Sequence, residues 1–459
     1  MKKTLIFLFS IVVLIALLPL IGNKLIEQEL DNKLEVLISY GVEVKNTTTD
    51  RSYLSTQKHY ELSVIDSDKF QTYLQNFTSS HVPTYVNTFI DGTTMGIDIK
   101  YSNFPLSDAL SVDIYPLALS EKNINLIAKK DSKFALYIKN MLENKTILYH
   151  INYNIIKSEF NGFVKDIDEN YTIKDGRKII FNLKGFKFSG DGLLMAPDRI
   201  NSQTKEFSIY ISEPNEKISV VFKDLSSTSN FESTSTYLYG GEIKSFDFKL
   251  NNIDNDNISL NLQKLHLNVA SNTQAKKAEF STKTSFDSFE MNTKNKNTKL
   301  NGFNYDLFIK DLDKDSFEKL SVILAQTNSL QPEELNSELS NAIMKILANG
   351  LAITLADFSV KKIDYLDEKG MDGFSVKTNL VITKDEILLQ NSNKISNSAV
   401  DNIALDSSMK ISKKLFLAIK KEFPLLMLVE AYAKDSAEFL VYDTEIKDNK
   451  FIVNGKQLR

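Results

Sequence analysis

Four histidines are the side chains best suited to proton transfer near neutral pH in this 459-residue chain. They are His59, His81, His150 and His266, and none lies within five residues of another. A locally built metal site needs ligands at short, regular spacing. We therefore interpret the four as scattered surface or ladder histidines, and we expect neither a metal nor another cofactor.

Nucleophile and phosphate motifs are missing from the sequence. The patterns G-x-S-x-G, G-x-x-x-x-G-K-[ST] and G-x-G-x-x-G do not occur. The run Gly190-Asp191-Gly192 is interpreted as a hairpin turn. The chain has 59 acidic residues, but spacing along strands does not tell which of them meet across a cleft. We nominate no catalytic residue on these grounds.

One short motif points to a covalent modification. Asp168-Glu169-Asn170-Tyr171-Thr172 contains the glycan acceptor pattern N-x-T, with an acid two residues before Asn170. Some bacteria with an envelope glycosylation system prefer this acid-extended form, so Asn170 is a candidate glycan acceptor. The alternative interpretation is an acidic turn between two strands.

Charge and cysteine content exclude several classes of protein. The formal net charge is −4, or −6 without Lys2 and Lys3. A nucleic-acid-binding surface needs a basic excess to neutralise phosphates, so no nucleic-acid partner is expected. The absence of cysteine excludes a disulfide scaffold, a thiolate metal site and a lipid-modified cysteine. Hydrophobic residues at 42% and charged residues at 25% are globular values.

An uncharged apolar segment from Leu5 to Gly22 comes after the basic pair Lys2 and Lys3. Its eighteen residues are just long enough for a helix rising ~1.5 Å per residue to cross a bilayer core of ~30 Å. Positive residues stay on the cytoplasmic side, so the rest of the chain is expected outside the cytoplasm. The side chains expected to form this membrane anchor are Leu5, Phe7, Phe9, Val12, Leu14, Leu17 and Leu20.

A cleaved signal peptide is the competing interpretation of this segment. Cleavage needs a pair of small residues before the cut, and the pairs Leu20 with Gly22 and Leu18 with Leu20 both fail. The segment also runs on into a helical pattern. We therefore favour a transmembrane anchor over 1–22 and a membrane-proximal helix over 23–40.

The long middle part, 41–312, is predicted to be a β-rich extracytoplasmic domain. Apolar residues alternate with polar ones, as at Phe246, Phe248 and Leu250. From about 146 the strand pattern is almost unbroken, and the breaks are rich in Asn, Asp and Gly. This is typical of long antiparallel strands with one apolar and one polar face. Helices are expected over 67–90 and 131–144.

The last part, 313–459, mixes helices and strands and is expected to pack on the same body. The third of its helices, 412–434, has a basic start and an apolar face. We interpret it as packing on its own sheet, with a membrane surface or a groove as the alternatives. Helices are predicted over 316–328, 332–347 and 412–434, and strands over 351–364, 371–383, 439–447 and 450–453.

The fold class indicated by these patterns is α+β, mainly β. We expect an N-terminal transmembrane helix and then an elongated antiparallel β-sheet body with interspersed helices. The segments are 1–22, 23–40, 41–312 and 313–459.

Three landmarks resemble one bacterial family. They are Asp50-Arg51-Ser52-Tyr53-Leu54-Ser55, the stretch 346–353 with Lys369 to Val376 after it, and Phe451 to Lys456. In this order the chain resembles the YdgA-like proteins, domain of unknown function 945, although Ser52 stands where that family usually has Gly. More distantly it resembles AsmA-like envelope proteins. The resemblance implies an inner-membrane protein facing the periplasm, and it transfers no catalytic residue.

The sequence supports two hypotheses of function. The favoured one is a non-enzymatic envelope protein, a scaffold or a β-groove for a lipid or another apolar ligand, located in the bacterial inner membrane with its bulk in the periplasm. Its expected partners are the membrane, crossed once, and a lipid or another envelope protein. The alternative is an enzyme that acts on an envelope polymer through two carboxylates roughly 5–9 Å apart.

Overall fold

The computed structural model divides the chain into two units, residues 1–204 and 205–459. The predicted anchor, 1–22, and His81 lie outside the described residues. Within the described ranges no helix is both long and apolar enough to span a bilayer. The described residues are 24, 26–28, 30–78, 90–104, 110–154, 156–173, 176–193, 196–233, 235–252, 257–294, 296–325, 332–365, 368–384, 402–423, 425–447 and 450–457.

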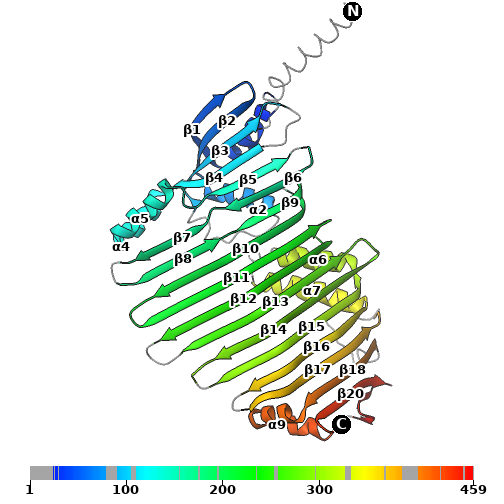
Figure 1. Cartoon of the computed structure of the whole chain (residues 1–459). Coiled ribbons are helices and arrows are strands. Elements are labelled where there is room, and N and C mark those ends of the chain that lie inside the picture. The colour runs from blue at the N-terminus through cyan, green and yellow to red at the C-terminus, as the bar shows by residue number, and fades with distance from the viewer. Residues whose placement is uncertain are drawn as a thin grey trace, which may run out of the picture. The chain divides into compact units, whose positions relative to one another are not determined.

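The prediction of a mainly β fold with antiparallel strands is confirmed (Figure 1). In unit 1, β1 to β6 pair in chain order, and β9 and β10 come next after β6. β7 and β8 form a hairpin. The bounds are β1 Val42–Arg51, β2 Ser55–Val64, β3 Thr94–Ser102, β4 Leu110–Ala118, β5 Tyr149–Asn154, β6 Glu159–Val164, β7 Ile167–Thr172, β8 Lys178–Lys184, β9 Lys187–Leu193 and β10 Ala196–Ser212, which extends into unit 2.

The predicted helix before β1 covers one face of the first strands. Residues 26–28 and 30–39 are helical, and Gly41 ends the helix with φ +83°. The apolar stripe of this helix is Ile26, Leu30, Leu34 and Leu37, and it packs on a buried cluster of the sheet. That cluster consists of Val42, Tyr60, Leu62, Ile99 and Tyr101.

Three further helices belong to unit 1: α2 (Ser67–Thr78), α4 (Glu121–Lys130) and α5 (Ser132–Glu143). The sequence predicted α2 and α5 but not α4. Both α4 and α5 begin with a capping side chain. Ser120 Oγ accepts from the Asn123 N–H, and Asp131 accepts from the Lys133 and Phe134 N–H groups.

The interpretation of Gly190-Asp191-Gly192 as a hairpin turn is wrong. All three residues lie within β9. Gly190 pairs with Phe160 of β6, and Gly162 of β6 pairs with Phe188. Each phenylalanine ring lies over the glycine opposite it, where a Cβ would collide with the ring. The glycines therefore make room for aromatic rings rather than for a change of chain direction.

Unit 2 is a second antiparallel ladder, in which β11 to β18 pair in chain order and β20, β21 and β22 come next after β18. The sequence predicted most of these strands and the closing hairpin, but it missed β18. The bounds are β11 Glu216–Phe231, β12 Tyr237–Asn252, β13 Ile258–Asn272, β14 Lys277–Asn292, β15 Asn297–Asp313, β16 Leu351–Tyr365, β17 Glu368–Ile382, β18 Ile403–Ser412, β19 Lys434–Asp435, β20 Phe439–Lys447, β21 Lys450–Val453 and β22 Lys456–Gln457.

Four helices belong to unit 2 in the described part of the chain. α6 (Lys314–Ala325) and α7 (Pro332–Ala348) confirm the first two predicted helices. The single helix predicted over 412–434 is two helices, α9 (Lys413–Glu422) and α10 (Leu426–Glu430), and β19 comes after them. α9 ends at Phe423, whose φ of −122° and ψ of 80° are not helical.

The unit boundary at 204/205 and the predicted boundary at 312/313 mark different features. The sequence changes from strands to helices at 313, where α6 begins directly after β15. The contacts between residues instead separate the chain within β10. The helices after 313, α6 and α7, pack on β14 and β15, which precede it.

Candidate functional site

The candidate site is one face of the strand ladder in unit 2, named the apolar face. Phe222 of β11 pairs with Phe246 of β12, and Phe246 pairs with Leu262 of β13. The same row continues through Phe289, Leu300, Ile363 and Met371. Directly paired residues point to the same side of a sheet. On β11 to β13 the apolar face consists of Ile218, Val220, Phe222, Leu225, Ile243, Phe246, Phe248, Leu250, Ile258, Leu260, Leu262 and Leu265.

A crease crosses this ladder and keeps the apolar face continuous. Asp224, Lys264 and Gly302, on alternate strands, have positive φ of 47°, 52° and 67°. The register places all three in one transverse line. A left-handed residue shifts the alternation of the strand by one residue, as a bulge does. Leu300 and Phe303, three residues apart on either side of Gly302, therefore pack against the same core cluster.

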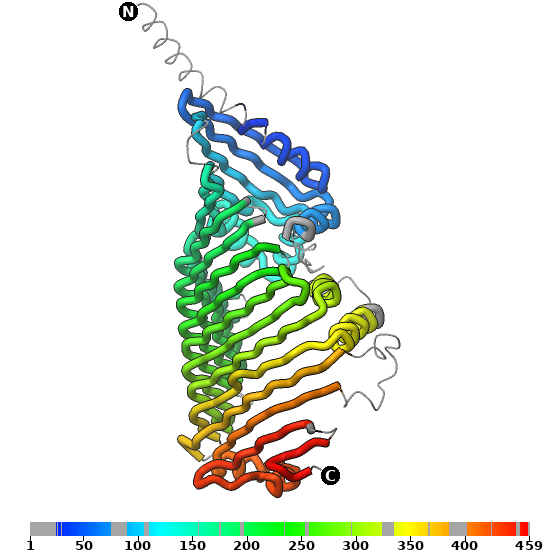
Figure 2. The backbone as a smooth tube through the Cα atoms, turned by 90° about the vertical axis from the view of Figure 1, so that its right-hand side faces the viewer, coloured from blue at the N-terminus to red at the C-terminus, as the bar shows by residue number. Residues whose placement is uncertain are grey.

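The helices of the described residues cover only parts of the apolar face. α9 buries Leu415 and Phe416 against β16 to β18, next to Val360 and Ile411. α6 and α7 pack on one end of β14 to β17, around Leu351 (Figure 2). Among the described residues 205–277, which include β11 to β13, no hydrophobic side chain is buried. The side chains of the apolar face there remain partly exposed to solvent.

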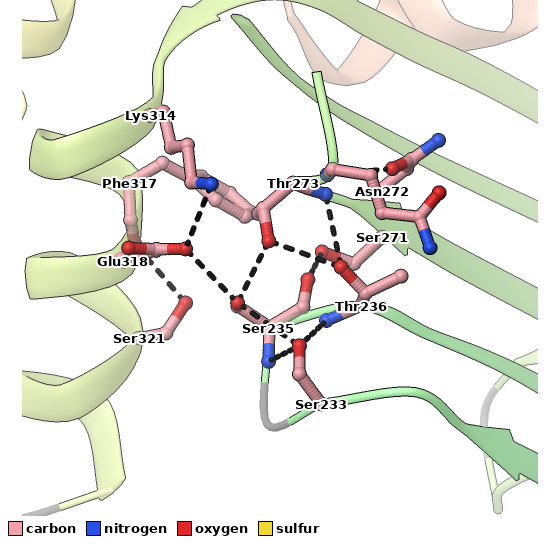
Figure 3. A network of polar contacts seen from close by, with 11 residues as sticks. Ser233, Ser235, Thr236, Ser271, Asn272, Thr273, Lys314, Phe317, Glu318 and Ser321 are labelled. Atoms are coloured by element: carbon pink, nitrogen blue, oxygen red, sulfur yellow. Dashed lines mark hydrogen bonds and ion pairs between the residues drawn. The ribbon is translucent and has the colours of Figure 1, made fainter. Parts of the chain in front are cut away.

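A polar network fixes α6 to the turns of the sheet (Figure 3). Ser235 Oγ lies 2.8 Å from Thr273 Oγ1 and 3.3 Å from Glu318 Oε1 of α6. Ser271 Oγ donates to the Ser235 carbonyl over 2.6 Å. Ser235, Ser271 and Thr273 are buried. The network holds α6 at the end of the ladder where β11 joins β12 and β13 joins β14.

The opposite face of β11 to β13 is polar and carries an open hollow of about 420 Å³. Gly240, Gly241, Ser226, Thr228 and Asn268 are among the residues that line it. Glu242 and His266 also line it, with His266 Nδ1 3.2 Å from Glu242 Oε1. The lining includes a single carboxylate, so the hollow does not offer the acid pair of the enzyme hypothesis.

A second polar arrangement crosses the sheet of unit 1. His59, Asp98, Asp113 and His150 pair in one row across β2 to β5. His59 Nδ1 lies 2.5 Å from Asp98 Oδ1, and His150 Nδ1 lies 2.6 Å from Asp113 Oδ1. The two carboxylates thus stand on neighbouring strands, each with a histidine on its outer side. Two of the predicted ladder histidines therefore do lie in a cross-strand ladder.

The environment of Asp98 favours its ionised form. Tyr115 Oη donates to Asp98 Oδ2 over 2.9 Å, and Lys145 Nζ lies 3.1 Å from the same oxygen. Burial raises the pKa of Asp98, but the bonds from His59, Tyr115 and Lys145 outweigh burial and hold the pKa below its ordinary value. A general acid needs a raised pKa, so Asp98 is better suited to holding the strands and Lys145 together.

The other predicted site residues have separate positions. Asn170 is exposed in the middle of β7, where it pairs with Ile180. The alternative interpretation of its motif as a turn is therefore wrong, while use of Asn170 as a glycan acceptor stays a prediction. The anchor residues Leu5 to Leu20 lie outside the described residues. In the part of the chain that the structure describes, no group of three or more His, Asp and Glu could hold a metal ion.

Sequence reasoning found the apolar strands but missed how they join into one face. The sequence feature that could have indicated the continuous face was the repeated spacing of three between apolar residues, as in Leu262 and Leu265 or Phe286 and Phe289. That spacing breaks the period of two within each strand.

Comparisons with known proteins give no further assignment. No protein-family model, no curated protein and no solved structure matches the chain. The resemblance to YdgA-like and AsmA-like proteins therefore stays a prediction, and a proposal of function depends on the geometry of the apolar face.

Proposed function

We propose that this chain is a non-enzymatic, inner-membrane-anchored periplasmic protein whose apolar face in unit 2 binds lipid acyl chains. The observation that carries the proposal is the half-buried apolar face of β11 to β13, on which no hydrophobic side chain of the described residues is buried. The apolar segment 5–22 and the basic pair before it support the anchor and the orientation. Membership of the YdgA-like family is part of the same proposal.

An acyl chain fits the chemistry of this face. The central row runs from Phe207 through Phe222 to Phe246, with ring centroids 6.0 and 4.7 Å apart. Burying one such side chain stabilises by ~1.5–3 kcal/mol. An apolar surface of this extent on a soluble domain is typical of a binding surface. Since the row carries no polar side chain across β11 to β13, the matching ligand is a hydrocarbon rather than a sugar or a peptide backbone.

The apolar face is open over β11 to β13 and covered by helices over the strands that follow. α6 and α7 close one end over β14 to β17, and α9 closes the far strands. A ligand lying across β11 to β13 would complete the cover that these helices begin. A scaffold role, in which an apolar protein segment occupies the same face, is the outcome that the experiment must separate from lipid binding.

The test is site-specific photo-crosslinking in cells. A photoreactive phenylalanine analogue at Phe248 lies on the apolar face, and the same analogue at Lys249 lies on the opposite face of the same strand. We expect a lipid-sized mass increase at position 248 and none at 249. A crosslink at 248 to a protein would support the scaffold role instead. Equal labelling at both positions, or none at 248, would overturn the lipid proposal.

The anchor has its own test. A reporter that is active only outside the cytoplasm, fused after Arg459, should be active. Recovery of soluble periplasmic protein that lacks residues 1–22 would contradict the anchor, because it would mean that the segment is cleaved.

A further inference from the structure

The corner between α9 and α10 exposes a dense apolar surface that the fold does not use. α9 buries Leu415, Phe416 and Ala418 against the sheet, whereas α10 has no buried residue. Leu425 is 80% exposed and Leu428 is 70% exposed. The exposed side chains, named the bilayer corner, are Leu417, Phe423, Leu425, Met427, Leu428 and Val429.

The corner is held in place by its other side. Leu426, Ile419 and Tyr432 pack against the core cluster of β16 to β20, which fixes the backbone of both helices. Lys420 Nζ of α9 lies 2.8 Å from Glu430 Oε2 of α10 and ties the two helices together. The exposed leucines are therefore presented on an anchored corner rather than on a fraying end.

The charges around the corner are basic. Residues 413–434 contain five lysines and two glutamates, in a chain whose net charge is −4. Glu422 lies 3.1 Å from Lys296 Nζ, and two of the five lysines are paired, Lys420 with Glu430 and Lys413 with Asp435. Lys414 and Lys421 are exposed on α9, and the ion pairs found in the described residues do not include them.

We propose that the bilayer corner docks on the surface of a lipid membrane with anionic headgroups. Leucine, phenylalanine and methionine would enter the headgroup boundary to a depth of ~5–10 Å, and Lys414 and Lys421 would lie among the phosphates. A second copy of the chain fits less well. A two-fold contact centred on this corner would bring the lysines of both copies together, and like charges oppose association.

The chain provides a clean spectroscopic test, since it contains no tryptophan. Full-length protein carrying Leu428→Trp is reconstituted into vesicles of phosphatidylglycerol and phosphatidylcholine. Brominated lipid is placed either in these vesicles or in added acceptor vesicles. We expect the tryptophan emission to shift to the blue and to be strongly quenched with at least one of these two placements of brominated lipid. The matched control is Ile343→Trp on α7, which is also exposed and should show neither effect.

Two further variants test the chemistry of docking. Lys414→Glu with Lys421→Glu, made in the Leu428→Trp chain, should reduce quenching several-fold with anionic lipid. Leu425→Asp should do so with any lipid. No quenching at position 428 in either arm, or quenching that the lysine reversal leaves unchanged, would overturn the proposal. So would a blue shift that appears without lipid and grows with protein concentration, because that result would identify a second copy as the occupant.

This inference stands apart from the proposed lipid-binding face. Phe248→Asp should abolish ligand capture on the apolar face and leave the quenching at position 428 intact. Leu425→Asp should do the reverse. The two proposals can therefore fail independently.

Discussion

The first strands of unit 1 and strands β11 to β13 of unit 2 differ in how their apolar faces are covered. Both are antiparallel ladders with one apolar face. In unit 1 the helix over 26–39 covers that face, and Tyr101 is only 1% exposed. Before β11 the connection is the tight turn 213–215, and only five residues separate β11 from β12. Turns of this length leave no chain for a helix between the strands. A meander of long strands therefore depends on some other element, or on a ligand, to cover its apolar face.

The comparison predicts its largest difference for a charge placed on each apolar face. Leu62→Asp buries a carboxylate under the helix over 26–39 and should destabilise the fold by about 4 kcal/mol or more. Leu260→Asp on β13 leaves the carboxylate in reach of water and should cost about 1–2 kcal/mol. Urea unfolding of the full chain in detergent, monitored by circular dichroism, measures both values. Equal losses would show that β11 to β13 are as well covered as β1 to β4.

The glycines of the two units should respond differently to an added methyl group. At Gly162 a Cβ would collide with the His150 carbonyl and the Phe188 ring. Gly162→Ala should therefore destabilise by about 1–3 kcal/mol. At Gly240 the nearest atom is Asn268 Oδ1 at 3.2 Å, the end of a side chain, so Gly240→Ala is the matched control. Unfolding of the two variants at the same urea concentration would contradict the requirement for glycine at position 162.

The crease can be tested by exchanging residue types along it. Gly302 has a φ of 67°, so Gly302→Ala should cost about 1 kcal/mol. Asp224 adopts a similar conformation with a side chain, so Asp224→Gly should be nearly neutral or slightly stabilising. Thermal unfolding of both variants gives the comparison. Loss of stability in Asp224→Gly, similar to that in Gly302→Ala, would contradict left-handed backbone as the basis of the crease.

The smallest effect is expected from pH in unit 1. The folded pKa of Asp98 lies below its ordinary value of 3.8. The ionised group therefore stabilises the fold above that value, and this contribution is lost as pH falls through the folded pKa. Asp98→Asn should flatten the acid limb of stability against pH below about pH 4. Glu279→Gln on β14 controls for the loss of one charge. If stability falls with acid in Asp98→Asn as it does in the unmodified chain, ionised Asp98 does not contribute to stability.

The sequence by itself determined most strands, the helix before β1 and the closing hairpin. Each rests on local signals, such as the apolar stripe of Leu30, Leu34 and Leu37 or the alternation from Phe246 to Leu250. The sequence also indicated the apolar faces of the strands, while the anchor over 1–22 stays a prediction. It missed α4 and β18, and it joined α9 and α10 into one helix. The alternation of Ile403, Leu405, Met409 and Ile411 was the available signal for β18.

Only the tertiary structure decided which residues stand opposite one another. Pairing places Gly190 under Phe160, and it joins His59, Asp98, Asp113 and His150 from four strands into one row. The same register lines up the left-handed residues of the crease. Hydrogen bonding between backbones sets register over long distances in sequence, whereas periodicity reports each strand alone. The period of two could therefore give each strand an apolar face, but pairing had to make those faces one surface.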